Sequence, residues 1–132
     1  MTNGLISVYN VGNYYPLYNK DVEIRGQAKC NSVAGSCTVA FHGRSVDGPA
    51  NYNILGTDYK NFVVVYNCMN KAYGLFHTTY LWILSRTPVL SDDKMKEAQA
   101  LIQSKIPGYS SLIWGSDTYQ GVDCPYKDWD QA

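Results

Sequence analysis

The sequence predicts an all-β domain, in which long antiparallel strands form a sheet that curls around a pocket and one α-helix follows. Residues 53–68 form two apolar runs that meet at Thr57-Asp58-Tyr59, a pattern typical of two strands joined by a tight turn. A third long run, residues 76–86, comes next, and a helical pattern follows it directly. Strands arranged in this way favour the carrying of a small molecule over its chemical transformation.

The first third of the chain predicts three more strands. Residues 5–10 form a β-rich run, and we expect it to end in a loop that begins at Gly12. Residues 21–30 alternate between apolar and polar side chains, which is the two-residue period of a half-buried strand. After a turn, residues 37–42 would return antiparallel to that strand.

The four cysteines, at positions 30, 37, 68 and 124, favour an oxidising compartment because their number is even. Cys30 and Cys37 flank the turn of the predicted hairpin, so they form either a short-loop disulfide or two free thiols. No C-x-x-C pair is present, and His42 and His77 lie far apart in the sequence. The pattern therefore does not favour a structural zinc site.

One helix is predicted, beginning after Ser91 and ending before Pro107-Gly108. Ser91 is a favourable N-cap, and Asp92 and Asp93 place negative charge in the first turn. The apolar side chains recur every three or four residues on one side, which predicts that the helix packs on the outside of the sheet: Met95, Ala98, Ile102 and Ile106. Residues 111–114 would form one more short strand.

Composition excludes several classes of partner. The chain carries 11 basic and 11 acidic side chains without a run of either sign, which disfavours nucleic acid and a polybasic membrane contact. No apolar stretch is long enough to span a bilayer, and residues 1–4 lack the features of a secretion signal. Twelve tyrosines reflect either β-propensity or a pocket lined by rings with polar tips.

Motifs for catalysis are missing from the sequence. It contains no Gly-x-Ser-x-Gly, no His-Glu-x-x-His and no phosphate loop. Asp58 is expected to brace its own turn. We therefore expect no enzymatic activity, no metal and no cofactor other than a pigment or lipid bound as ligand.

Several segments, in their order and spacing, resemble the signature blocks of the lipocalin family. They include Thr57-Asp58-Tyr59, the run ending in Tyr66-Asn67-Cys68, and Trp-Ile-Leu-Ser-Arg at residues 82–86. Residues 3–4, 24–28 and 122–126 fit the same pattern. The subgroup that these motifs resemble comprises apolipoprotein D, the bilin-binding proteins and the crustacyanins.

The resemblance implies an eight-stranded up-and-down antiparallel barrel, of which this chain would hold six strands plus a C-terminal α-helix packed outside. Lipocalins open with a Gly-x-Trp motif, and this sequence contains none. We therefore expect residues 1–132 to form a single lipocalin-like domain that is N-terminally incomplete. Two open sheet edges would invite pairing with another chain, and we expect a homo-oligomer through them.

The same resemblance implies roles for three further residues. In the family, the arginine equivalent to Arg86 packs over the tryptophan of the Gly-x-Trp motif. The cysteines equivalent to Cys68 and Cys124 pair with two cysteines in the segment that this chain lacks. Here both would have no partner.

Resemblance to the bilin-binding proteins also decides which side chains face the cavity, because it places Tyr80 and Trp82 inside. Alternation along each strand then extends the predicted ligand-binding set: Val8, Asn10, Ile24, Val39, Phe41, Tyr52, Ile54, Val63, Val65, Asn67, Phe76, Thr78, Tyr80 and Trp82. Leu84 shares this face. The outward face would carry Phe62, Val64, Tyr66, His77, Leu81 and Ile83.

By this resemblance the chain is a secreted carrier of a small hydrophobic ligand, such as a bilin, carotenoid, steroid, retinoid or fatty acid. One alternative is a coloration protein that holds a pigment in an oligomer. Another is a lipocalin-type isomerase that uses a cavity thiol. Cys30 and Cys37 are the only candidates for that thiol, and a disulfide between them would exclude it.

Overall fold

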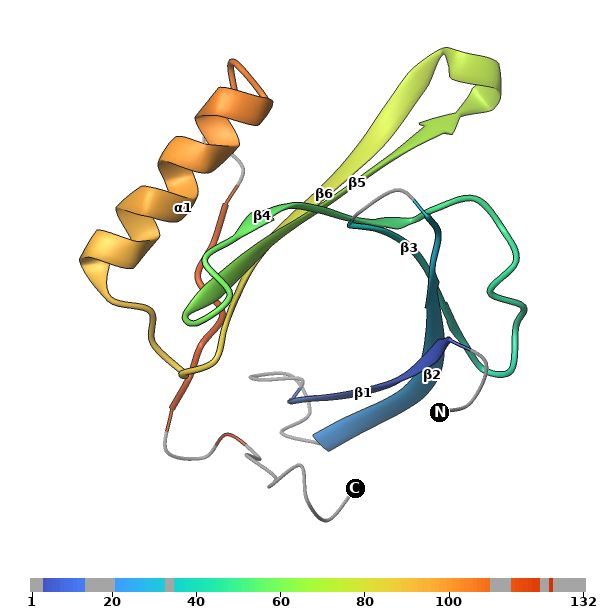
Figure 1. Cartoon of the computed structure of the whole chain (residues 1–132), viewed down its shortest axis with the longest axis horizontal. Helices are drawn as coiled ribbons and strands as arrows, with labels where there is room; N and C mark the ends of the chain where they lie inside the picture. Colours follow the sequence, from blue (N-terminus) through green and yellow to red (C-terminus); the bar gives the residue numbers. More distant parts are fainter. Residues whose placement is uncertain (1–3, 14–20, 33–34, 110–114, 122–123, 125–132) are drawn as a thin grey trace.

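Six antiparallel strands, paired in chain order, form one curved sheet (Figure 1). The structure is a computed structural model that describes residues 4–13, 21–32, 35–109, 115–121 and 124. Its elements, in order, are β1 (Leu5–Asn13), β2 (Asp21–Cys30), β3 (Ser36–Phe41), β4 (Tyr52–Thr57), β5 (Phe62–Lys71), the 3-10 turn η1 (Ala72–Gly74), β6 (Phe76–Ser85) and α1 (Asp92–Lys105).

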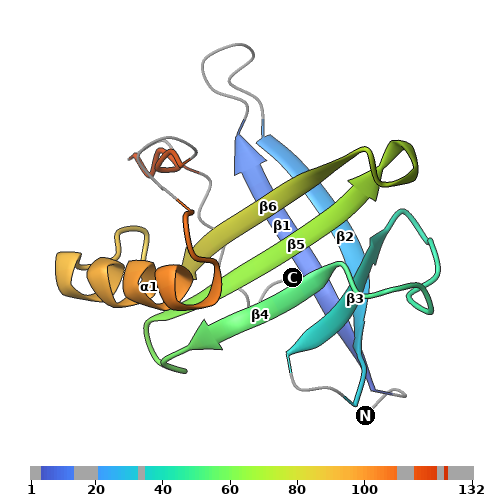
Figure 2. The same ribbon diagram turned by 90° about the horizontal axis from the view of Figure 1, so that it is seen from above.

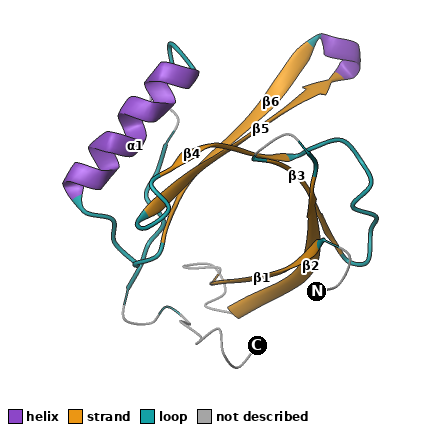
Figure 3. Cartoon of the chain, in the orientation of Figure 1, coloured by secondary structure: helices purple, strands orange, loops and turns teal. Residues whose placement is uncertain are grey.

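The sheet curls so that its first and last strands face each other. Figure 2 shows β1 and β2 crossing beneath β5 and β6, and Figure 3 shows α1 on the convex side of the sheet. Within the described residues β1 and β6 each pair with only one neighbouring strand, so both are edge strands. The predicted all-β architecture with one outer helix is confirmed, as an open half-barrel.

The β5–β6 hairpin has the longest strand pairing in the sheet. Its register runs without interruption from Phe62 opposite Ser85 to Lys71 opposite Phe76. Valine, isoleucine, threonine and aromatic residues, which favour extended backbone, make up half of β5 and most of β6. This hairpin therefore forms the longest regular part of the sheet, and the helix packs on its first strand, β5, and on β4.

The sheet bends between β3 and β4, where the register contains only two pairs, Ser36 with Asn53 and Cys37 with Tyr52. The side chain of Asn51 continues the pairing beyond them. Its Oδ1 accepts a hydrogen bond from the Val39 amide at 2.8 Å, and its Nδ2 donates to the Val39 carbonyl at 2.9 Å. The side-chain amide of Asn51 thus makes the two hydrogen bonds to Val39 that a backbone partner would make in a continued strand pair.

Helix α1 packs on β5 through one apolar cluster. Phe62 and Val64 of the sheet are buried against Ala98 and Ile102 of the helix. Partly buried side chains surround them: Leu55, Leu81, Ile83, Leu90, Leu101 and Tyr109. The expectation that Leu81 and Ile83 face outward, toward the helix or solvent, is confirmed, and both pack in the cluster under the helix.

Cys30 and Cys37 form a disulfide that joins β2 to β3. The register places them directly opposite each other, which decides between the two alternatives that the sequence allowed. Cys68 and Cys124 are free thiols among the described residues. A protein disulfide persists in an oxidising environment, in agreement with the compartment that the cysteine count favours.

Three local expectations need correction or stay untested. β1 continues through Gly12 to Asn13, where a loop was expected, because these residues still pair with Val22 and Asp21. Ser91 is the N-cap, yet its side chain makes no capping hydrogen bond. The short strand expected at residues 111–114 lies outside the described residues.

The turn between β4 and β5 is organised by Asp58. Its Oδ1 accepts hydrogen bonds from the amides of Lys60 at 3.0 Å, Asn61 at 2.7 Å and Phe62 at 3.1 Å. Its Oδ2 lies 3.2 Å from Lys94 Nζ, which ties the turn to the first turn of α1. Hydrogen bonds from the side chain and backbone of Asn61 lower the pKa of Asp58 far below its usual range. The expected turn-bracing role is confirmed.

Replacement of this carboxylate should make folding stability less dependent on pH. Because the folded pKa of Asp58 lies below its unfolded value of about 3.9, its stabilising contribution is complete above about pH 5 and declines as the pH falls through about 4. We expect Asp58→Asn to lower the thermal unfolding midpoint at pH 7 and to flatten the decline between about pH 5 and pH 2.5.

Asp47→Asn provides the matched control, because Asp47 pairs with Lys29 at 2.6 Å on an exposed loop, where an ion pair contributes little. Unfolding midpoints for both variants, measured across this pH range by circular dichroism, check the prediction. Equal midpoints for Asp58→Asn and Asp47→Asn at pH 7 would contradict it.

Candidate ligand-binding site

All of the residues predicted to bind ligand lie on one side of the sheet, here called the concave face, opposite α1. On β5 and β6 the register pairs Val63 with Leu84, Val65 with Trp82 and Asn67 with Tyr80. Directly opposed residues of antiparallel strands point to the same side. Phe62 and Val64 alternate with this set and face the helix, so the set itself faces away from it.

The remaining strands continue the same face. On β4, Ile54 lies opposite Val65, and Tyr52 lies opposite Cys37 of β3. The pairs that carry the face across β3, β2 and β1 are Val39 with Ala28, Phe41 with Gly26, Val8 with Gly26, and Asn10 with Ile24. Thr78 and Phe76 lie on the same face of β6, opposite Met69 and Lys71. The strand register thus places these residues on one face of the sheet, and their contact with a ligand stays a prediction.

Large apolar side chains on the concave face are exposed. Tyr80 and Trp82 are each 42% exposed and stack, with ring centroids 5.7 Å apart and an interplanar angle of 9°. Ile54, Phe76 and Leu84 of the same face are also exposed. Side chains of these types are usually inside a protein, and their gathering on one face is typical of a binding surface.

Asn67 is the buried polar residue of this face. It is 7% exposed and lies between Val65 and Met69 on β5, opposite Tyr80. Among the described residues, no hydrogen-bond partner reaches its side-chain amide. Because an unpaired buried amide costs free energy, Asn67 is suited to bind a polar group of a molecule that lies on the concave face.

Other polar groups are spread along the face. Thr78 is half-buried and Asn10 is exposed. Tyr52 is half-buried, and its burial raises the pKa of its hydroxyl, which keeps that group protonated and able to donate a hydrogen bond at neutral pH. A mainly apolar wall with a few polar groups is the usual composition of a site for a hydrophobic ligand.

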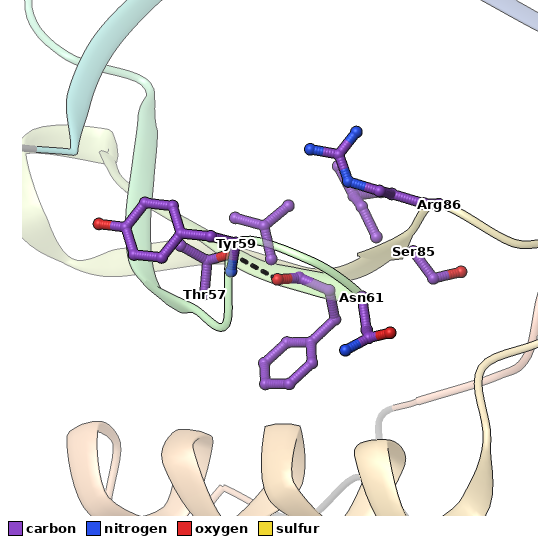
Figure 4. Close-up of a pocket in the computed structure, with 8 residues that line it drawn as sticks. Thr57, Tyr59, Asn61, Ser85 and Arg86 are labelled. Atoms are coloured by element: carbon purple, nitrogen blue, oxygen red, sulfur yellow. Dashed lines mark hydrogen bonds between the residues drawn. The ribbon is translucent and has the colours of Figure 1, made fainter.

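A pocket of about 300 Å³ lies at the end of the sheet where β5 begins and β6 ends. Figure 4 shows Thr57, Tyr59, Asn61, Ser85 and Arg86 around it, with the Arg86 side chain extending away from the helix. Val63 and Leu84 join this pocket to the concave face. The Arg86 amide donates a hydrogen bond to the Asn61 carbonyl at 3.2 Å, which holds the two sides of the pocket together.

Sequence reasoning missed several residues of this surface. Ile6 lies on the concave face two positions before Val8, and its strand alternation was a usable signal. Met69 follows Asn67 at the same two-residue spacing on β5. Tyr59 and Asn61 belong to a recognised turn, but no local pattern indicates that they line a pocket with Arg86.

The two thiols that the sequence offered for catalysis are not free. The disulfide removes the thiols of Cys30 and Cys37, the two candidates for an isomerase. Cys68 lies opposite Thr79, and thus on the side of the sheet that faces away from Trp82. Among the described residues no group of three His, Cys, Asp or Glu side chains could hold a metal ion. The described part of the chain also contains no helix with the length and apolar character needed to cross a bilayer.

Comparison with known proteins agrees with this picture. The lipocalin / cytosolic fatty-acid binding protein family matches residues 6–111. Apolipoprotein D of Mus musculus is 32% identical over 82 residues, which are 62% of this chain and 43% of the relative. The bilin-binding protein of Pieris brassicae is 27% identical over 110 residues, which are 79% of this chain and 57% of the relative. The match thus spans about half the length of these curated relatives.

A solved structure supports the fold. The crystal structure of lobster apocrustacyanin A1 superposes with a TM-score of 0.71 at 22% identity, and the match covers 93% of this chain and 64% of that one. At 22% identity this likeness shows the fold alone.

Proposed function

The chain belongs to the lipocalin / cytosolic fatty-acid binding protein family, whose members bind small hydrophobic ligands, and from this premise we propose that it carries such a ligand on its concave face. The observation that supports this function most directly is the exposure of Tyr80, Trp82 and Leu84 on the side of the sheet that the helix leaves open. A bound molecule would remove this apolar surface from water.

The proposed contact surface consists of the residues on the concave face that the sequence predicted. The stacked rings of Tyr80 and Trp82 would form its central wall, with Val65 opposite Trp82 on β5. Asn67 would hold one polar group of the ligand, which gives the ligand a defined orientation. The hydroxyl of Tyr52 would supply a second hydrogen bond from β4.

A flat conjugated molecule suits this wall better than a flexible chain. The rings of Tyr80 and Trp82 are stacked and nearly parallel, at 9°, so a planar conjugated partner could extend the stack on the outer face of either ring. One relative of this chain is named for binding a bilin, and bilins are conjugated molecules. We therefore place bilins and other planar pigments first among the ligands, ahead of steroids and fatty acids.

The proposed site of action is outside the cell. The Cys30–Cys37 disulfide supports this location, since such bonds persist in secreted proteins and are rare in the cytosol. An enzymatic role for a cavity thiol has lost its two candidates to the same disulfide. The carrier function and a pigment-holding role in an oligomer remain, and both use the concave face.

Removal of the Trp82 side chain should weaken ligand binding. We expect Trp82→Ala to lower the affinity for biliverdin or retinol by at least tenfold, because the central wall of the site is lost. Thr79→Ala, three positions before Trp82 on β6 and on the opposite face of the sheet, should bind as the unmodified protein does. Absorbance titration measures both affinities. Binding of neither compound by the unmodified protein, or equal binding by both variants, would contradict the proposal.

Asn67 should select for ligands with a polar group. We expect Asn67→Leu to lower the affinity for retinol by about tenfold and to leave that for a planar hydrocarbon such as pyrene unchanged. The free energy of unfolding without ligand should stay equal or rise, because an unpaired buried amide is removed. A lower unfolding free energy in urea would instead assign Asn67 a role in folding.

Open sheet edges should support association of the chain with itself. β6 is a long edge strand within the described residues, and an unpaired strand edge can pair with another copy. We propose a homo-oligomer through this edge and expect its sedimentation coefficient to rise with concentration. Thr79→Lys, which places a charge on the exposed edge, should reduce this association. A monomer at every concentration would overturn the proposal.

A further inference from the structure

The β5–β6 hairpin extends beyond the rest of the sheet and ends in η1 (Figures 1 and 3). Its end, here called the hairpin tip, consists of residues 71–77. Three large side chains of the tip are exposed: Tyr73 fully, Leu75 at 86% and Phe76 at 59%. Three such side chains within four residues form a compact apolar projection, and nothing among the described residues covers it.

The backbone of the tip has an unusual conformation. Ala72 and Tyr73 have φ values of 47° and 57°, in the left-handed region that residues with a Cβ rarely adopt. Gly74, which follows them, also has a positive φ of 88°. The chain thus holds an exposed aromatic ring at the end of a hairpin in a costly conformation, a feature that often marks a functional segment.

Charge on this hairpin has one sign. No aspartate or glutamate occurs from residue 59 to residue 91, whereas Lys71 and His77 are the first and last residues of the tip. A surface that approaches a lipid headgroup layer therefore carries no carboxylate that would need to be desolvated there. Tyrosine at the end of an apolar projection is typical of residues placed at a membrane–water interface.

We propose that the hairpin tip inserts its apolar side chains into the surface of a lipid bilayer. The tip is convex, so a protein partner would have to supply a matching pocket, whereas a bilayer accepts a projection of any outline. The few residues involved predict weak, reversible attachment and not a spanning segment. Because the chain has zero formal net charge, the attachment should depend on apolar contact more than on anionic lipid.

Phe76 connects the tip to the concave face. It begins β6, and Thr78, Tyr80, Trp82 and Leu84 follow it on the same face at two-residue spacing. A hydrophobic molecule that leaves the bilayer beside the tip would meet this row of side chains without crossing bulk water. This route rests on the proposed carrier function, whereas attachment of the tip to lipid does not.

Co-sedimentation with vesicles of neutral phosphatidylcholine tests the proposal without any ligand. We expect the unmodified protein to sediment with the vesicles, and Tyr73→Ser combined with Leu75→Ser to reduce its partition at least tenfold. Val89→Ser is the matched control, because Val89 is an apolar side chain 75% exposed beyond the other end of β6. It should leave partition unchanged.

The outcomes separate this proposal from the carrier function. Retinol affinity of the double variant should equal that of the unmodified protein, because Tyr73 and Leu75 lie outside the proposed ligand site. Failure of the unmodified protein to bind vesicles, or an equal loss in Val89→Ser, would overturn the membrane contact and leave ligand binding untouched. The proposal would also be overturned if the double variant partitioned to vesicles as the unmodified protein does but associated with itself more weakly. That result would indicate that the tip contacts a second copy of the chain.

Discussion

Packing of α1 against the convex side of the sheet determines where the other features of this protein lie. Phe62 and Val64 are buried with Ala98 and Ile102 between the sheet and the helix. Because side chains alternate along a strand, burial of these two residues directs Val63 and Val65 to the other side. The register carries that choice through β6 and β4 and across the sheet. The helix therefore covers one face and leaves the other open.

When no ligand is bound, this arrangement lowers the stability of the protein. Each Å² of apolar surface exposed to water costs about 25 cal/mol, and the rings of Tyr80 and Trp82 are both partly exposed. Asn67 adds a buried amide without a hydrogen-bond partner among the described residues. A ligand that covers the rings and pairs with the amide would remove both costs, so the same features that weaken the empty protein would strengthen the complex.

The β5–β6 hairpin joins four regions of the molecule. One face of it carries the core under the helix, and the other carries the centre of the candidate site. Its near end contributes to the pocket beside Arg86, and its far end is the apolar tip around Tyr73. A long, regular strand pairing is stiff, which suits an element that holds a binding surface at a constant distance from a projecting tip.

The sequence by itself determined the strands, the helix and the braced turn, because each depends on residues close together in the chain. Residues 21–30 alternate strictly and form β2, and Asp58 binds amides within four positions. The choice of inner face came from family resemblance, since alternation alone does not say which side is covered. Only the tertiary structure decided the rest. It joined Cys30 to Cys37, which strand pairing sets opposite each other, and it brought Arg86 beside Asn61 from another strand. Contacts between distant segments depend on register and curvature, and these arise only when the whole sheet forms.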